Sequence, residues 1–84
     1  MEASNTQRNE MEIRFDSRSE NEGFARVSVA SFLTQLNPTV EEVADVKTAV
    51  SEAVTNAIIH GYDNQVQKIR IRCQVSDRTL YVQV

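Results

Sequence analysis

The stretch SEAVTNAIIHGY, residues 51–62, carries the side chains of this sequence that are best suited to chemistry. Glu52, Asn56 and His60 recur at intervals of four, so on a helix they share one face and lie one turn apart. An amide oxygen beside a carboxylate suits a hard cation such as Mg²⁺, which takes oxygen ligands and usually keeps several waters and substrate phosphates. The carboxylate could instead polarise an attacking hydroxyl group.

The same spacing also fits an ordinary solvent-facing stripe, because Glu, Asn and His are common on exposed helix faces. Two observations favour a site. Asn is a poor residue for the middle of a helix, since its amide competes for backbone hydrogen bonds. The polar row also runs beside the small residues Ala49, Ala53 and Ala57, which leave room for a ligand against the helix.

Helical periodicity surrounds this row and extends upstream of it. Apolar residues recur at helical spacing from Val43 to Gly61, after a capping box of Thr39 and Glu42. Gly61 is expected at the C′ position in a left-handed conformation. A first helix is predicted over about 20–36, with Ser19 as its N-cap and Glu22 as the capping-box partner. The segment 37–39 contains a proline and separates the two helices.

Three segments alternate apolar and polar residues in the manner of half-buried strands: MEIRFD (11–16), KIRIRCQV (68–75) and LYVQV (80–84). A loop is predicted at 62–65 and a turn at 76–79. The order strand, helix, helix, strand, strand predicts an α+β two-layer sandwich, with both helices on one face of a mixed sheet. We expect one domain over residues 11–84, after a mobile arm at 1–10.

The composition is that of a small globular domain. The chain has 84 residues, of which 40% are hydrophobic and 25% charged, and its net charge of −3 implies no general affinity for nucleic acid. The single cysteine, Cys73, excludes an internal disulfide and is expected to be a buried small hydrophobe. The polar start is no signal peptide, and no apolar run reaches the ~20 residues that span a bilayer. We therefore expect a cytoplasmic protein without a membrane partner.

The segment SEAVTNAIIHGY resembles the N-box helix of the GHKL ATPase/kinase superfamily, whose members share the Bergerat-type ATPase fold. The longer segment ENEGFARVSVASFLTQLNPTVEEVADVKTAVSEAVTNAIIHGY, residues 20–62, is similar to the bacterial anti-sigma factor kinases of sporulation. This resemblance extends over about 11–84, nearly the whole chain after the arm.

The resemblance implies a role for each matching residue. Asn56 would coordinate the Mg²⁺ that bridges the ATP phosphates, and Glu52 would act as the base toward an incoming serine hydroxyl. His60 and Gly61 would lie where the helix opens toward the nucleotide, although a structural histidine at the helix end is an equal alternative. Arg26 would dock both a sigma factor and its phosphorylatable antagonist; from the residues alone it is a surface charge.

The resemblance therefore implies a homodimeric serine/threonine protein kinase that uses ATP and Mg²⁺. Such a protein inhibits a sigma factor of RNA polymerase and phosphorylates a serine of the anti-anti-sigma protein. A non-catalytic module that sequesters a transcription factor is the alternative. A sensor histidine kinase would need a preceding helical phosphoacceptor region, for which an arm of ten residues leaves no space.

The chain has only two glycines, Gly23 and Gly61, and neither lies in a phosphate-binding loop. The D-x-G-x-G adenine box and the glycine-rich lid of the superfamily are missing. We expect a fragment that ends at Val84 and holds the metal and base half of an ATP site. By itself it should neither bind ATP detectably nor fold stably as a monomer.

Overall fold

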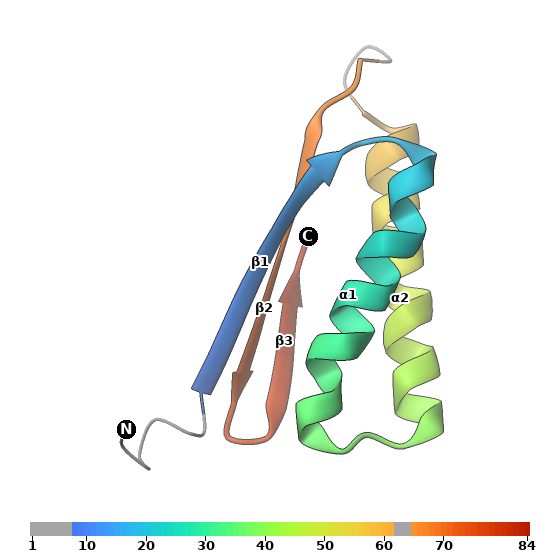
Figure 1. Cartoon of the computed structure of the whole chain (residues 1–84). Helices are drawn as coiled ribbons and strands as arrows, with labels where there is room; N and C mark the ends of the chain where they lie inside the picture. Colours follow the sequence, from blue (N-terminus) through green and yellow to red (C-terminus); the bar gives the residue numbers. More distant parts are fainter. Residues whose placement is uncertain (1–7, 62–64) are drawn as a thin grey trace.

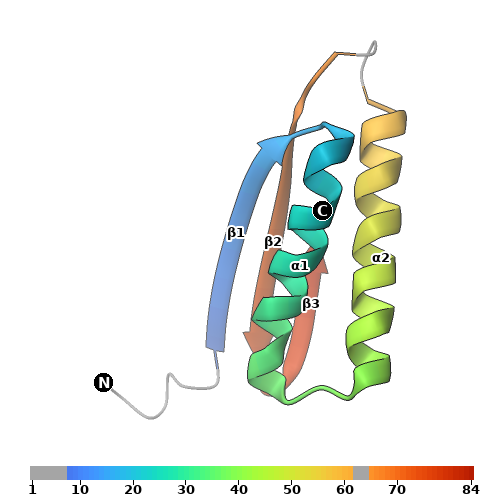
Figure 2. The same ribbon diagram turned by 45° about the vertical axis from the view of Figure 1, so that its right-hand side comes forward.

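The computed structural model describes residues 8–61 and 65–84 of the chain. It contains three strands, β1 (Arg8–Asp16), β2 (Lys68–Ser76) and β3 (Thr79–Gln83), and two α-helices, α1 (Glu22–Leu33) and α2 (Val40–Ile59). Short 3₁₀ turns, η2 (Ser19–Asn21) and η3 (Thr34–Leu36), flank α1. Figures 1 and 2 show both helices on the same face of the sheet. The predicted α+β class with two layers is confirmed.

The described strands pair in the order β1-β2-β3, and both pairings are antiparallel, where we expected a mixed sheet. The two helices explain this difference. One helix between two strands brings the chain back so that the second strand runs parallel to the first. Here two antiparallel helices lie between β1 and β2, so the chain reverses once more and β2 runs antiparallel to β1. Figure 1 shows β2 accordingly running opposite to β1.

The register of the sheet places the alternating apolar residues on the face that the helices cover. Ile13 pairs with Ile71 and Phe15 with Ile69. The inward side chains of β2 are buried, whereas its charged residues on the other face are exposed. Cys73 is among the buried ones, as predicted, and burial raises the pKa of its thiol.

The core lies where the two helices meet the sheet. Val29 of α1 and Val54 of α2 are fully buried, together with Ile71 of β2. Phe15 contacts Phe24 of α1 edge to face, with ring centroids 6.2 Å apart. These contacts fix the orientation of α2, so that its outer face and its side facing β3 remain accessible.

Several predicted element ends are corrected by the structure. β1 begins at Arg8, three residues before the predicted start at Met11; residues 1–7 of the expected arm and residues 62–64 of the expected loop lie outside the described part. Ser19 makes no capping hydrogen bond, and α1 begins only at Glu22. Its carboxylate pairs with Arg26 instead of reaching back to Ser19.

The left-handed residue lies at the end of α1, where none was predicted, and not at Gly61. Gly61 has no positive φ, whereas Asn37 after α1 is left-handed with a φ of 53°. Gly61 lies so close to the end of α2 that a Cβ there would be 3.3 Å from the carbonyl oxygens of Ala57 and Ile58. A close approach, and not a left-handed turn, therefore accounts for this glycine.

Candidate functional site

Helix α2 carries the polar row. Its first turn is closed by the predicted capping box, in which Thr39 Oγ1 accepts from the Glu42 amide and Glu42 Oε1 accepts from the Thr39 amide. Glu52 and Asn56 lie on its outer part, both exposed, and with Ser51 and Thr55 they line a shallow hollow. We call it the Glu52–Asn56 hollow. The structure thus brings the expected base and the expected metal ligand together.

A second depression, the α2–sheet groove, lies between the last turns of α2 and the sheet. It has a volume of about 630 Å³. Ala53, Asn56, Ala57 and His60 line it from the helix, and Val84 is among the residues that line it from the sheet side. The small residues beside the polar row therefore leave room for a ligand, as the sequence predicted.

The groove continues toward the start of α2 as an apolar depression. Ala53 and Val84 belong to both parts, and Val46, Ala49, Val50 and Val82 line the continuation. The side chains of Val82 and Val84 are 39% and 49% exposed, although their strand positions face the helices. A mainly apolar cleft with a few polar groups at its rim is typical of sites for small organic ligands, including cofactors.

Asn56 is the residue that joins the two depressions, because it lines both the Glu52–Asn56 hollow and the α2–sheet groove. Within the described residues, no side-chain hydrogen bond occupies its amide or the carboxylate of Glu52. Both groups are therefore available to a ligand. A molecule seated in the groove would meet the Asn56 amide first and the Glu52 carboxylate one turn further along.

His60 lines the α2–sheet groove beside Asn56 but does not reach the Glu52–Asn56 hollow. It is the exposed C-cap residue of α2. Gly61 lines neither depression, and the close backbone approach described above accounts for it. The predicted row therefore divides into a Glu52–Asn56 pair and a separate histidine at the groove.

Sequence reasoning missed the groove residues on the sheet, above all Lys68 and Val84. Lys68 begins β2, and Figure 1 shows the start of β2 near the end of α2. Its Nζ lies 2.7 Å from Asp16 Oδ1, and this hydrogen bond, followed by the charge of Lys68, lowers the pKa of Asp16. The apolar/polar alternation of residues 80–84 marked Val84 as inward-facing. It did not show that α2 would leave Val84 half covered.

Arg26 lies on α1 and reaches across to α2. Its Nη1 donates to Glu22 Oε2 at 3.0 Å and to Ser51 Oγ at 3.4 Å. Ser51 lines the Glu52–Asn56 hollow, so the predicted docking residue lies beside the predicted catalytic face. The contact with Ser51 depends on how the helices pack, so no sequence pattern predicted it.

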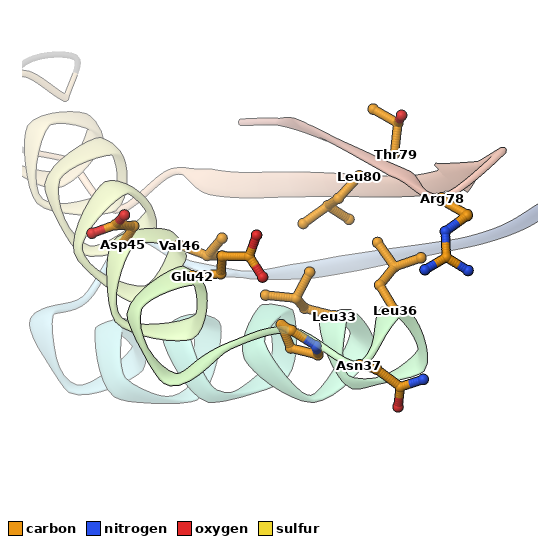
Figure 3. A pocket seen from close by; sticks show the side chains of 10 residues that line it. Leu33, Leu36, Asn37, Glu42, Asp45, Val46, Arg78, Thr79 and Leu80 are labelled. Atoms are coloured by element: carbon orange, nitrogen blue, oxygen red, sulfur yellow. The ribbon is translucent and has the colours of Figure 1, made fainter.

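A third depression, the end pocket, lies near the other end of α2, between the α1–α2 connection and the β2–β3 turn. Figure 3 shows Leu33, Leu36 and Leu80 pointing into it, with Glu42 and Arg78 from different elements at its sides. Asp45 also lines it, and the Glu42 carboxylate is held in the capping box. Two carboxylates at its rim oppose a polyphosphate, so the end pocket is not our candidate site.

Comparisons with known proteins identify the family of the chain. Residues 8–84 match the family described as histidine kinase-like ATPase domain. The anti-sigma F factor of Clostridium acetobutylicum is 58% identical over 76 residues, which cover 90% of this chain and 53% of the relative. The anti-sigma F factor of Clostridium kluyveri is 58% identical over 72 residues, covering 86% and 51%.

The anti-sigma F factor of Thermoanaerobacter sp. is 55% identical over 76 residues, covering 90% of this chain and 53% of the relative. The chain spans about half the length of the curated relatives that it matches. The predicted resemblance to anti-sigma factors and to the ATPase superfamily is confirmed by these matches. Neither described helix is long and apolar enough to cross a membrane.

Proposed function

Because the chain belongs to the histidine kinase-like ATPase domain family, we propose that it supplies the metal and base side of an ATP site in an anti-sigma factor kinase. The position of Asn56 carries this proposal. Its amide stands between an apolar groove, which suits a nucleotide base, and a hollow that exposes the Glu52 carboxylate. The family relationship supports a nucleotide site in this chain, and the two depressions support its location along this part of α2.

The partners of the proposal come from the relatives. Three proteins at 55–58% identity carry the name anti-sigma F factor. By analogy, the protein that contains this chain would bind and inhibit a sporulation sigma factor as a cytoplasmic homodimer. It would transfer phosphate to a serine of the anti-anti-sigma antagonist, and Arg26 would contact both partners. Its place beside the Glu52–Asn56 hollow supports this arrangement.

The residues present fit a magnesium ion that is held mainly by its nucleotide. The described residues contain no group of three or more His, Cys, Asp or Glu side chains that would form a protein cage for a metal. Asn56 offers one free amide oxygen, and Mg²⁺ in phosphate sites often takes only one or two protein ligands. When bound, the ion would neutralise charge on the phosphates.

We assign to Glu52 the proton transfer that phosphorylation of serine requires. Its carboxylate is exposed in an open hollow, where a side chain of another protein has access. In the proposed step the serine oxygen forms a bond to the γ-phosphorus of ATP, while the bond to the β–γ bridging oxygen breaks and ADP leaves. The hydroxyl proton passes to the Glu52 carboxylate. His60 lines the α2–sheet groove and remains at the proposed nucleotide side, without a chemical step of its own, whereas Gly61 lines neither depression.

Two variants of the full-length protein test the proposal. Asn56→Ala should lose affinity for Mg-ATP, because the amide ligand is removed. Glu52→Gln should keep nucleotide affinity but lose phosphoryl transfer about 10²–10⁴-fold, since the amide cannot accept the proton. The readouts are calorimetric titration with Mg-ATP and transfer of labelled phosphate. Glu41→Gln, an exposed carboxylate in the first turn of the same helix, is the control.

Normal transfer by Glu52→Gln would refute its role as the base. Normal Mg-ATP affinity of Asn56→Ala would refute its role at the metal.

The alternative function, a module that sequesters a transcription factor without catalysis, is favoured by two exposed apolar residues on α1. Phe24 and Val27 are 52% and 55% exposed and lie on the same helix as Arg26. ATP turnover that depends on Glu52 separates the two functions.

A further inference from the structure

The face of the sheet that points away from the helices carries a ladder of charged side chains. We call it the outer face; both described helices lie on the other side of the sheet (Figure 2). On β2 the ladder consists of alternate, exposed residues that stand between buried apolar ones. The register of β1 with β2 places Asp16 opposite Lys68, Arg14 opposite Arg70 and Glu12 opposite Arg72.

Two of these cross-strand pairs join opposite charges, at N–O distances of 2.7 and 3.9 Å. The pair between them, Arg14 with Arg70, joins two positive charges. Directly opposite residues have Cβ atoms about 4.5–5.5 Å apart, and like charges in such a position destabilise a sheet. The Arg14–Arg70 pair therefore interrupts a ladder that is complementary on either side of it.

The described carboxylates do not compensate both arginines. Arg14 Nε donates to Glu12 Oε2 at 2.9 Å, but the other oxygen of the same carboxylate lies 3.9 Å from Arg72. With the residues that the structure describes, Arg70 makes no side-chain hydrogen bond or ion pair. The Arg14 side chain is 67% exposed and Arg70 is exposed as well. The two Nη groups of Arg14 and the guanidinium of Arg70 are thus open to an anion from outside.

Arg70 lies at an edge of β2 that β3 does not cover. The pairing of β2 with β3 begins only at Arg72, whose partner is Gln83. Arg70 therefore also borders the α2–sheet groove. Strand alternation nevertheless directs its Cβ to the outer face, because Ile69 and Ile71 on either side of it are buried in the core.

The outer face also carries an exposed aromatic residue. Tyr81 of β3 is 57% exposed and pairs with Gln74 of β2. Together with Arg72, Gln74 and Gln83 it lines a hollow of about 210 Å³. Aromatic side chains are enriched where proteins contact one another, and a hollow beside one can receive a side chain of the partner.

We propose that the outer face docks an extended acidic segment of a partner protein, with one aspartate or glutamate side chain between Arg14 and Arg70. This inference does not depend on the proposed kinase function. A carboxylate there accepts hydrogen bonds from both guanidinium groups and offsets their mutual repulsion. A nucleic acid or an anionic membrane fits less well, because its many phosphates would also meet Asp16 and Glu12, the carboxylates of the neighbouring pairs.

The hollow at Tyr81 determines what else the segment should contain. Gln74, the partner of Tyr81, lies four residues after Arg70, which is about 13 Å along the strand. An extended segment that lies along β2 covers the same distance in four residues. We therefore expect an aromatic or large apolar residue four positions from the acidic one.

Titration of the full-length protein with two synthetic peptides tests this proposal. The probe is acetyl-Ser-Glu-Thr-Ser-Thr-Tyr-Ser-amide, and the matched peptide has glutamine in place of glutamate. NMR signals of the arginine Nε–H groups report binding at Arg14 and Arg70. The glutamate peptide should shift both signals and bind about three- to tenfold more tightly than the glutamine peptide, through charge-assisted hydrogen bonds at an exposed site.

Three variants show whether the two arginines cause this difference. Arg14→Gln and Arg70→Gln should each remove most of the preference for the glutamate peptide. Arg8→Gln deletes the same charge from the outer face at a position opposite Ser76, and it should keep the preference. Urea unfolding without peptide gives a second readout. In a double-mutant cycle, Arg70→Gln should be more favourable to stability when Arg14 is present than in the Arg14→Gln background.

Each contrary result overturns a stated part of the proposal. If both peptides bind equally, or if neither shifts the signals of Arg14 and Arg70, the docking site is refuted. If Mg-ATP displaces the glutamate peptide, the peptide lies in the α2–sheet groove and not on the outer face. Tighter binding of polyuridylate or of phosphatidylglycerol vesicles that requires both arginines would make the ligand a phosphate polyanion. A cycle without repulsion would show that the Arg14–Arg70 pair needs no anion.

Discussion

Thr39 and Glu42 exchange two hydrogen bonds at the first turn of α2, one in each direction between side chain and backbone. This pair fixes where the helix begins. Because α2 then continues for 20 residues without interruption, each side chain keeps a fixed angular offset from the next along the whole helix. Glu52 and Asn56 owe their common face to a helix whose beginning lies three to four turns away.

Replacement of Thr39 by alanine should destabilise the full-length protein by about 1 kcal/mol, because the Glu42 amide loses its acceptor. For a protein of the relatives' length, about twice that of this chain, the melting temperature should fall by about 2–4 °C in a thermal unfolding experiment. Thr48→Ala is the control, since Thr48 is exposed in the middle of the same helix and alanine is the better helix former there. An equal loss in both variants would contradict the capping role.

The secondary structure follows from local patterns, and these were visible in the sequence. Alternation of apolar residues predicted β2 almost to the residue, and the Thr39 capping box was correct. The other capping box failed because Glu22 has a competing partner in Arg26, one turn further along the helix. A sequence pattern shows that two residues can bond, but not which of two possible partners wins.

The site was predictable only where it depends on one helix. Glu52 and Asn56 lie together because they are four residues apart. The α2–sheet groove, the contact of Arg26 with Ser51 and the position of Lys68 depend on tertiary packing between different elements. Arg26 and Ser51, for example, are 25 residues apart in the sequence. The exposed fraction of a side chain such as Val84 likewise depends on what α2 covers, which periodicity does not determine.

The β2–β3 turn contains an unusual residue for its backbone. Asp77 and Arg78 have φ values of 52° and 69°, which is the pattern of a type I′ hairpin turn. Asp tolerates this region, whereas Arg is strained there. Arg78→Gly should stabilise the full-length protein by about 0.5–1 kcal/mol after the greater entropy of the unfolded glycine chain is subtracted.

Chemical denaturation measures the gain from Arg78→Gly. Asp77→Gly is the matched control and should gain less, because its native residue is already compatible with a positive φ. If both variants were equally stabilised, the strain would not be specific to Arg78. A loss of stability in Arg78→Gly would instead mean that the arginine side chain makes a stabilising contact at the end pocket that it lines.

The ion pair of Asp16 with Lys68 predicts a pH dependence of stability. The pKa of Asp16 lies below its ordinary value of 3.8 because Lys68 donates a hydrogen bond to the ionised carboxylate and carries a positive charge. The folded state therefore binds this proton more weakly than the unfolded state. The stabilising contribution is fully present above the ordinary value and is lost as the pH falls through the lowered one.

Asp16→Asn should consequently be less stable than the unaltered protein at pH 7, and the difference should shrink as the pH falls below 3.8. The effect is small because both side chains are well exposed to solvent. Urea unfolding at a series of pH values measures it, and added salt should reduce it. A difference that stays constant from pH 7 to pH 2 would show that the charge of Asp16 is not its cause.

Ala53 lies at the junction of the α2–sheet groove and its apolar continuation, so its small side chain keeps the groove open. In the full-length protein, Ala53→Leu should fill this space and weaken Mg-ATP binding at least about tenfold, since a steric block inside a ligand cleft removes the volume that the ligand needs. The fold should persist, because Ala53 is only partly buried and leucine is a good helix former.

Ala44→Leu, at an exposed position of the same helix, should leave binding unchanged. Calorimetric titration measures the affinity and circular dichroism checks the fold. A folded Ala53→Leu protein with normal affinity would show that the nucleotide does not enter the groove, and the site would then have to lie on the outer face of α2 alone.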